Sequence, residues 1–292
     1  MIRPDAVSPA SDSTAGEAPS ARYLYCVIAR HKEDASTLAG IDNRPVYPVS
    51  AGRLSALVHD CAPRPYQGDD ETVKRWVAAH AAVVEAAWKR AGSVLPMSFD
   101  VIVRPGAGRT ADENLRAWLE RNEEPFSAAL AEFEHKVELG VQILWDPDEI
   151  ARGISAGNQH IAQLQREMAT KSAGAAYFCR QKIAQALREA MEVKADADYR
   201  AYYQRIGSHA DDIVVNKVKS QEDRQMLLHL SLLVAREKVS ALGAELAAVA
   251  AQEGLEVRFT GPWPPYSFAA KVAATGDDRR RGQVEVEHTD KS

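Results

Sequence analysis

The residues best placed for chemistry in this sequence are a histidine and a cysteine two positions apart, His59 and Cys61. Such a pair supports nucleophilic catalysis when the imidazole takes the thiol proton and a third group orients the imidazole. These two residues flank the end of an expected strand with no visible third group, so nucleophilic catalysis is disfavoured. His80 falls on the apolar side of an expected helix, and His229 alternates within an expected strand. Both are interpreted as core histidines and not as metal ligands.

Phosphate, zinc and redox motifs do not match the sequence. The Pro-Gly-Ala-Gly-Arg segment at 105–109 lacks the Gly-x-Gly-x-x-Gly and Gly-Lys-Ser/Thr patterns that hold phosphates, so a turn is the better interpretation. The cysteines, Cys26, Cys61 and Cys179, form no Cys-x-x-Cys pair, which excludes zinc-ribbon and thioredoxin-type motifs and fits a reducing compartment. We therefore expect no catalytic residue, no metal and no cofactor.

Charge and hydropathy restrict the partners. The formal net charge of −5 gives no electrostatic reason to expect nucleic acid or an anionic membrane surface as a partner. No apolar stretch approaches the roughly 20 residues that span a bilayer, so we expect a soluble cytoplasmic protein. Residues 1–20 lack the apolar core of a secretory signal and are expected to form a disordered tail, and the charged residues 275–292 a second flexible tail.

The apolar periodicity predicts a regular succession of elements. Strands are expected at 23–29, 45–49, 54–59, 93–103, 137–145, 213–218, 226–234 and 255–259, and helices at 73–92, 110–121, 125–135 and 235–254. Strands 45–49 and 54–59 are expected to form a hairpin. Residues 146–205 are expected to be largely helical, in two segments broken near the glycines at 153–157 or at Gly174.

The order of these elements is strand, helix, strand, strand, helix, strand, and it occurs twice, with the first helix of the first half weakly marked. This order predicts an α+β fold of two tandem ferredoxin-like (βαββαβ-type) domains, the second with an enlarged helical insertion. The N-terminal domain is expected at 21–134 with trailing helices, and the C-terminal domain at 135–274 with long helices.

A proline- and aromatic-rich segment follows the last expected strand. The segment Thr-Gly-Pro-Trp-Pro-Pro-Tyr-Ser-Phe occupies residues 260–268. Its three prolines lack donor N–H groups, so the segment is not expected to extend the preceding strand. Two interpretations remain open: a rigid plug that seals the C-terminal domain, or an exposed aromatic platform that binds a partner. The residues concerned are Gly261, Pro262, Trp263, Pro264, Pro265, Tyr266 and Phe268.

This segment closely resembles the Gly-Pro-Trp-Pro-Pro-Tyr segment near the C-terminus of gas vesicle proteins of the GvpL/GvpF family. Weaker similarities occur in the expected order along the chain. Tyr-Leu-Tyr at 23–25 resembles the opening strand of the family, and Leu-Pro-Met-Ser-Phe at 95–99, with Pro96 and Phe99, resembles its Leu-Pro-Met-x-Phe segment. Ala-Tyr-Phe at 176–178, with Tyr177, resembles the aromatic start of its long helix. Asp100 stands where the family commonly has Gly, which puts a tight turn there in doubt.

The resemblance implies two α+β domains and a non-enzymatic, chaperone-like role in gas vesicle formation. It further implies binding to the small apolar shell protein GvpA and to other gas vesicle accessory proteins. The alternative hypothesis is a ferredoxin-like small-molecule-binding or oxidoreductase-type protein, because that fold carries many activities. The alternative needs a deep pocket with convergent polar groups, and the sequence offers no candidate set.

Overall fold

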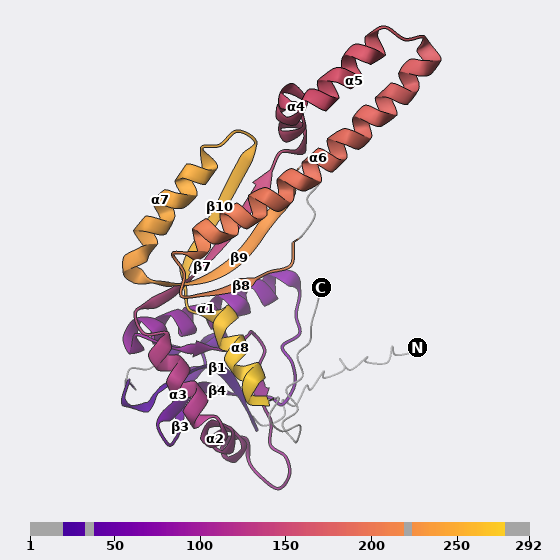
Figure 1. Cartoon of the computed structure of the whole chain (residues 1–292). Coiled ribbons are helices and arrows are strands. Elements are labelled where there is room, and N and C mark those ends of the chain that lie inside the picture. Colours follow the sequence, from indigo (N-terminus) through magenta and orange to yellow (C-terminus); the bar gives the residue numbers. More distant parts are fainter. Residues whose placement is uncertain (1–19, 33–37, 219–223, 278–292) are drawn as a thin grey trace, which may run out of the picture.

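Two β-sheets with helices packed on them make up the protein (Figure 1). The computed structural model describes residues 20–32, 38–218 and 224–277. The mixture of helices and antiparallel strands confirms the predicted α+β class. The expected tails, 1–20 and 275–292, lie almost wholly outside the described residues.

The first sheet is centred on β1 (Ala21–Ala29), an aromatic and β-branched strand that is buried on both faces. The other strands are β2 (Leu38–Ala39), β3 (Pro45–Ala51), β4 (Leu54–Cys61), β5 (Leu95–Pro96) and β6 (Ile102–Val103). Their order is β2-β3-β4-β1-β5, with β6 also paired to β1, and the β3–β4 hairpin confirms the prediction. The strand expected at 93–103 is interrupted, and β5 ends at Pro96, which lacks an N–H for further pairing.

Three helices accompany this sheet. Helix α1 (Asp70–Ala91) begins at Asp69, whose carboxylate accepts a hydrogen bond from the Thr72 N–H, and it ends at Gly92 in the left-handed region. Helix α2 (Ala111–Arg121) begins with a capping box between Thr110 and Glu113. Helix α3 (Glu123–Glu132) carries Pro125 in its first turn, where a missing N–H costs nothing. Short 3₁₀ turns occur at Arg30–Lys32, Ile41–Asn43 and Arg236–Lys238.

The second sheet has the order β10-β7-β9-β8, all antiparallel. Its strands are β7 (Lys136–Trp145), β8 (Asp212–Val215), β9 (Gln225–Ala235) and β10 (Leu255–Trp263). Helix α7 (Val239–Ala250) connects β9 to β10, as the sequence predicts, although it begins four residues later than expected because a 3₁₀ turn follows β9.

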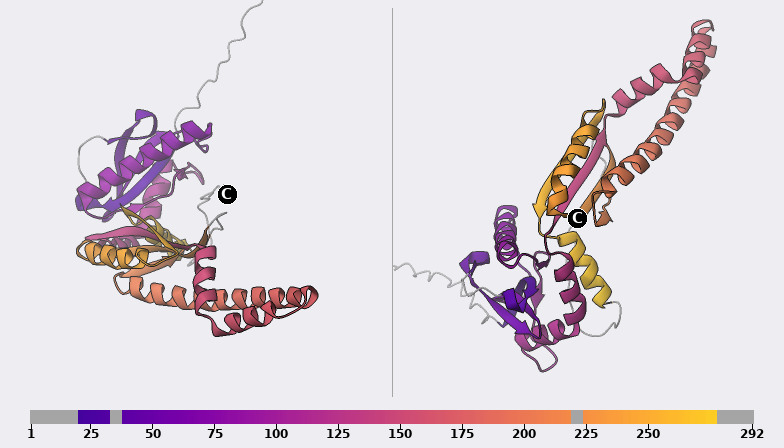
Figure 2. Two further views of the ribbon diagram at one scale, coloured as in Figure 1. Left: turned by 90° about the horizontal axis from the view of Figure 1, so that it is seen from above. Right: turned by 60° about the vertical axis from the view of Figure 1, so that its left-hand side comes forward.

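The helical region between β7 and β8 forms an arm that extends away from both sheets (Figures 1 and 2). The prediction of two segments is wrong, since there are three helices: α4 (Pro147–Gly157), α5 (Gln159–Ala169) and α6 (Ala173–Gly207). The first break lies at Asn158, whose side chain accepts hydrogen bonds from the first N–H groups of α5. Both breaks lie close to the suspected glycines: Gly157 is the last residue of α4, and Gly174 is the second residue of α6.

The expectation that residues 260–268 do not extend the last strand is also wrong. Strand β10 continues to Trp263, which pairs with Glu138 of β7 after a register shift that begins at Thr260. Beyond the irregular residues Gly261 and Pro262, hydrogen-bonded pairing with β7 resumes at Trp263. Because β10 is an edge strand, the N–H that Pro262 lacks is not needed by a further strand.

The two sheets share one packed structure. Helix α8 (Tyr266–Asp277) follows β10 directly, yet it packs against α3 and β5 of the first sheet (Figure 1). Its Phe268 and Ala269 lie in one apolar cluster with Leu24 and Leu95. On the opposite face of the first sheet, α1 covers Tyr25 and Ile28. The last helix therefore joins the C-terminal half of the chain to the N-terminal half.

Candidate interaction surface

The candidate catalytic pair His59 and Cys61 lies inside the core of the first sheet. His59 and Cys61 are both buried. Each ring nitrogen of His59 is close to a tyrosine hydroxyl: Nδ1 lies 2.7 Å from Tyr25 Oη and Nε2 2.9 Å from Tyr66 Oη. Burial raises the pKa of the Cys61 thiol to about 12, so it is protonated at neutral pH and does not supply a thiolate nucleophile.

His80 belongs to the same buried network, and its interpretation as a satisfied core histidine is confirmed. Its Nε2 lies 3.1 Å from the Met97 carbonyl, which only accepts, so Nε2 carries the proton. Its Nδ1 then accepts from the Tyr23 hydroxyl at 2.9 Å, and Tyr23 Oη in turn accepts from the Asp100 N–H at 3.1 Å. Burial lowers the pKa of His59 and of His80 to about 4, so both imidazoles are neutral near pH 7.

The tight turn that the sequence left in doubt is present at Asp100. This residue has a φ of +70°, in the left-handed region that favours glycine. Its carboxylate accepts a hydrogen bond from the Tyr66 N–H at 3.1 Å. Asp is among the few residues that adopt this conformation at moderate cost, because its short side chain bonds locally. The substitution of Asp for the expected Gly therefore preserves the turn and adds a contact.

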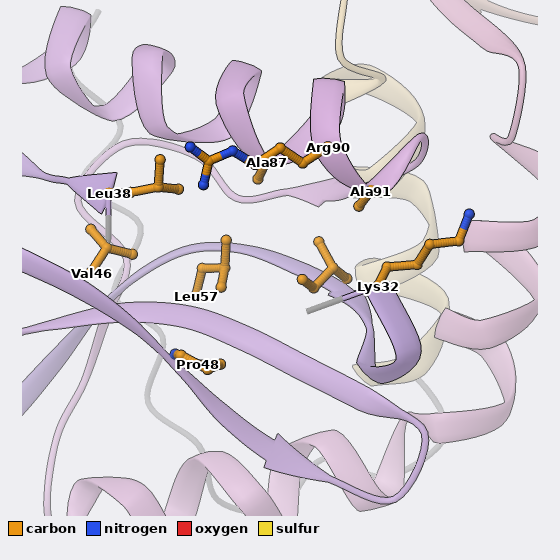
Figure 3. Close-up of a pocket in the computed structure, with 9 residues that line it drawn as sticks. Lys32, Leu38, Val46, Pro48, Leu57, Ala87, Arg90 and Ala91 are labelled. Atoms are coloured by element: carbon orange, nitrogen blue, oxygen red, sulfur yellow. The ribbon is translucent and has the colours of Figure 1, made fainter. Parts of the chain in front are cut away.

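A small cavity lies between the first sheet and α1 (Figure 3). Its volume is about 30 Å³, which is roughly the space of one water molecule and far below the few hundred Å³ of a typical ligand pocket. It is lined by Ile28, Lys32, Leu38, Val46, Pro48, Leu57, Ala87, Arg90 and Ala91. A cavity of this size does not supply the deep polar pocket that the small-molecule hypothesis requires.

Within residues 20–32, 38–218 and 224–277, His, Cys, Asp and Glu side chains form no group of three that could hold a metal ion. Over the same ranges, no helix combines the length and the apolar character needed to cross a membrane.

The proline- and aromatic-rich segment begins with a close approach between two strands. Gly261 has a φ of +113°, and a Cβ at this position would lie 2.8 Å from the Glu138 carbonyl oxygen. Both observations require glycine here. The following register shift places Trp263 opposite Glu138, with the indole 53 % exposed. Pro262 is exposed beside it.

The second half of the segment turns inward. Pro264 and Pro265 are buried, and Phe268 is almost fully covered. Tyr266 packs against the core of the first sheet, and burial raises the pKa of its phenol above the usual value. The inner residues of the segment are therefore buried at the junction between the halves of the chain, while Trp263 faces solvent.

The start of α8 is held by a buried carboxylate of β7. Glu138 accepts hydrogen bonds from the N–H and the hydroxyl of Ser267 at 2.8 and 2.6 Å. The carboxylate sits at the positive end of the helix and satisfies an N–H that the helix itself leaves unpaired. Sequence reasoning missed this pair, which is separated by 129 positions. The isolated Glu within the apolar run of β7 was the only signal for it.

The structure brings three of the resembling segments together, 23–25, 95–99 and 261–268, and leaves the fourth, 176–178, apart. Pro96 pairs with Cys26 on β1, and Phe99 lies 6.2 Å from Tyr23 between ring centroids. Helix α8 packs on β5, so the segments 95–99 and 261–268 meet at the junction. Tyr177 lies elsewhere, on α6 in the helical arm, and is 54 % exposed.

Among the described residues, exposed aromatic side chains occur in two places, and smaller exposed apolar residues occur on α1 and at the end of β8. One is the edge strand β10, where Phe259 is 42 % exposed on the same strand as Trp263. The other is α6, where Phe178 and Val193 are 68 % and 71 % exposed. Neither Phe259 nor Val193 was singled out individually from the sequence, although the long helical region that contains Val193 offers more apolar surface than one sheet can cover.

The fold is α+β, His59 and His80 are buried and neutral, and apolar side chains are exposed on a strand edge and on a helical arm. The comparisons are more specific. The family model of the gas vesicle synthesis protein GvpL/GvpF matches residues 21–270. Gas vesicle protein L1 of Halobacterium salinarum is 31 % identical over 260 residues, which is 86 % of this chain and 91 % of that protein. Gas vesicle protein L2 of the same organism is 29 % identical, over 91 % of this chain and 97 % of that protein.

A solved structure agrees at the level of fold. The crystal structure of the gas vesicle protein GvpF from Anabaena sp. PCC7120 superposes with a TM-score of 0.68, covering 86 % of this chain and 98 % of that one, at 18 % identity. The chain belongs to the gas vesicle synthesis protein GvpL/GvpF family.

Proposed function

We propose that this protein is a non-enzymatic assembly protein of gas vesicles, located in the cytoplasm and on the growing vesicle. It binds the apolar shell protein GvpA, and other gas vesicle accessory proteins, before these join the wall. Membership of the GvpL/GvpF family supports the role in gas vesicle formation. The single observation that supports the binding role is the pair of half-exposed aromatic side chains, Phe259 and Trp263, on an edge strand.

The physical need for such a partner is simple. A shell subunit that presents an apolar face to gas aggregates in water unless that face is covered. A soluble protein with exposed aromatic groups covers the face until the subunit is incorporated. The contact must be reversible, which fits a surface of a few large side chains better than a closed pocket.

Strand β10 has the features that binding of an extended segment requires. It pairs with β7 on one side only, so its outer N–H and C=O groups are available for a strand of a partner. Phe259 and Trp263 provide apolar contacts beside this edge. Two features limit pairing with a partner strand to the first residues of β10. One is the register shift between Thr260 and Trp263, and the other is Pro262, which has no N–H to donate. An added strand therefore pairs with the first half of β10, as far as Phe259, and Trp263 lies just beyond the paired residues.

We infer that each half of the chain is a ferredoxin-like domain, 21–134 and 135–274, the second with the helical arm as an insertion. The strand orders β3-β4-β1-β5 and β8-β9-β7-β10 support this, because both follow the second, third, first and fourth strands of a βαββαβ unit. The packing of α8 against the first sheet makes the two domains interdependent.

Co-purification tests the binding role. Tagged protein and GvpA are produced together, and the GvpA retained per tagged chain is measured. The double variant Phe259→Ser/Trp263→Ser is expected to retain less than about a tenth of the GvpA held by the wild type, because it removes both aromatic contacts. Val215→Ser is the matched control: Val215 is 55 % exposed on β8, the opposite edge of the same sheet.

Equal retention by all three proteins would refute the β10 surface. Absence of GvpA from the wild type, with a tightly held small molecule in its place, would favour the alternative function.

A further inference from the structure

The helical arm carries apolar and charged side chains on one exposed side of α6. Phe178 and Val193 are the most exposed large apolar residues among those that the structure describes. Lys182 and Glu189, also exposed, lie between them. Steps of four and three residues (178, 182, 185, 189, 193) keep these positions on one side of a helix. Cys179, the next residue after Phe178, is buried, so these positions flank the side of α6 that packs within the arm.

The positions of these residues are symmetric about one point. The midpoint between Phe178 and Val193 falls between Gln185 and Ala186, and so does the midpoint between Lys182 and Glu189. A two-fold axis through this point, with two copies of α6 antiparallel, sets each Phe178 beside Val193 of the other copy. The same operation sets each Lys182 beside Glu189 of the other copy. One surface is thus complementary to itself in both apolar character and charge, as a two-fold interface requires.

We propose that α6 binds α6 of a second copy of this chain, antiparallel, through this side of the helix. This interface is independent of the proposed binding of GvpA through β10.

The arm has room for a second helix. An open groove of about 680 Å³ runs between α5 and α6. Ala186 and Ala190 on its α6 side are small and permit close approach of a partner helix. Figures 1 and 2 show the arm extending away from the sheets, so this side of α6 is not covered by them.

In this arrangement, each end of the contact places Phe178 beside Val193 of the other copy and, one turn away, Lys182 beside Glu189 of the other copy. Gln185 donates a hydrogen bond to Glu189 within the same helix at 2.9 Å, which holds that carboxylate on the exposed side. The contact spans about four helical turns, roughly 22 Å, and therefore buries less surface than a permanent dimer interface. We expect reversible self-association in the micromolar range.

Sedimentation equilibrium of the full chain, from about 1 to 200 μM, tests the association. The wild type is expected to shift from monomer to dimer within this range. Lys182→Glu places like charges together twice per dimer and is expected to weaken the dimer at least about tenfold. The double variant Lys182→Glu/Glu189→Lys exchanges both partners of each pair and should restore the wild-type constant. A monomeric wild type, or a double variant as weak as the single one, would overturn the proposal.

Disulfide cross-linking tests the register. Phe178→Cys and Val193→Cys proteins are prepared separately, mixed and oxidised. The mixture is expected to form covalent dimers. Each variant alone should not, because the two copies of position 178 lie roughly 22 Å apart along the helix axis in this arrangement. The wild type, whose Cys26, Cys61 and Cys179 are buried, is the control for background cross-linking. Equal cross-linking of the mixture and of either variant alone would contradict the antiparallel register.

Discussion

Glu138 and Ser267, 129 positions apart, are joined by two hydrogen bonds of 2.8 and 2.6 Å between one carboxylate and the first turn of α8. Glu138 belongs to a central strand of the second sheet, and α8 packs on the first. The pair therefore fixes the point at which the chain crosses from one half of the molecule to the other. It also sets the direction of α8, because a carboxylate is favourable only at the N-terminal end of a helix.

Replacing this carboxylate tests its contribution. Glu138→Ala is expected to lower the free energy of unfolding by about 2–3 kcal/mol, since it removes two charge-assisted hydrogen bonds from a buried site. Urea denaturation at pH 7 measures the change. Glu256→Ala is the control, because Glu256 is paired with Arg258 at the surface and its loss should cost no more than about 1 kcal/mol. Equal effects of the two substitutions would contradict the role assigned to Glu138.

Gly261 is expected to be intolerant of any side chain. Gly261→Ala places a Cβ 2.8 Å from the Glu138 carbonyl oxygen at a φ of +113°, and should destabilise the protein by about 2 kcal/mol or more. Gly243→Ala is the matched control. Gly243 lies inside α7 with nothing within 4 Å of the added Cβ, so this change should stabilise by up to about 1 kcal/mol. Thermal unfolding of both variants gives the comparison, and two destabilised variants would argue against the close approach at Gly261.

The aromatic residues of one segment are expected to differ in their effect on stability. Phe268→Ala should cost about 3–5 kcal/mol, because Phe268 is 2 % exposed within the cluster at the junction. Trp263→Ala should cost less than about 1.5 kcal/mol, because half of the indole remains in water. The free energies of unfolding in urea provide the measurement. A cost for Trp263 as large as that for Phe268 would show that the whole segment is a buried plug.

Acidification should destabilise the protein through His59 and His80. Their pKa of about 4 in the folded protein lies below the ordinary value of 6.5, so the unfolded chain binds protons first. The stability that they contribute is complete above pH 6.5 and is lost as the pH falls toward 4, by up to about 1.4 kcal/mol per pH unit for each histidine.

The measurement is the free energy of unfolding at pH 7.5, 6 and 5. His80→Gln is expected to show a shallower decline than the wild type over this range. Gln offers one donor and one acceptor to Met97 and Tyr23 but does not titrate. His160→Gln, at an exposed position on α5, is the control and should retain the wild-type decline. An unchanged decline in His80→Gln would show that the buried imidazoles do not cause it.

Local patterns were sufficient for most of the fold. The apolar run of β1, the hairpin of β3 and β4 and the periodic stripe of α1 are each determined by residues close in sequence. In the arm, Asn158 caps α5 directly after Gly157, so the first break lies where a glycine indicated one. Only one of the two breaks was expected, and the second lies just before Gly174. The extension of β10 through Pro262 depended on its edge position, which is a property of the whole sheet.

The candidate surface was harder to predict than the fold. Trp263 and Phe268 belong to one segment and are both large and apolar, yet one is exposed and the other is buried. The difference arises because the chain crosses between the sheets at Pro264 and Pro265, and the position of the first sheet is not visible in the sequence of the second. The same limitation applies to Phe178 and Val193, whose exposure follows from the arm extending beyond any sheet.

The length of α6 has a mechanical consequence. Its 35 residues form a rod of about 52 Å, of which only the C-terminal part, with Tyr202 and Ile206, is anchored in the core. The N-terminal part, with Tyr177 and Phe178, projects beyond the sheets (Figure 1). Under the two contacts proposed above, such a rod would hold a second copy bound at α6 apart from a shell protein bound at β10.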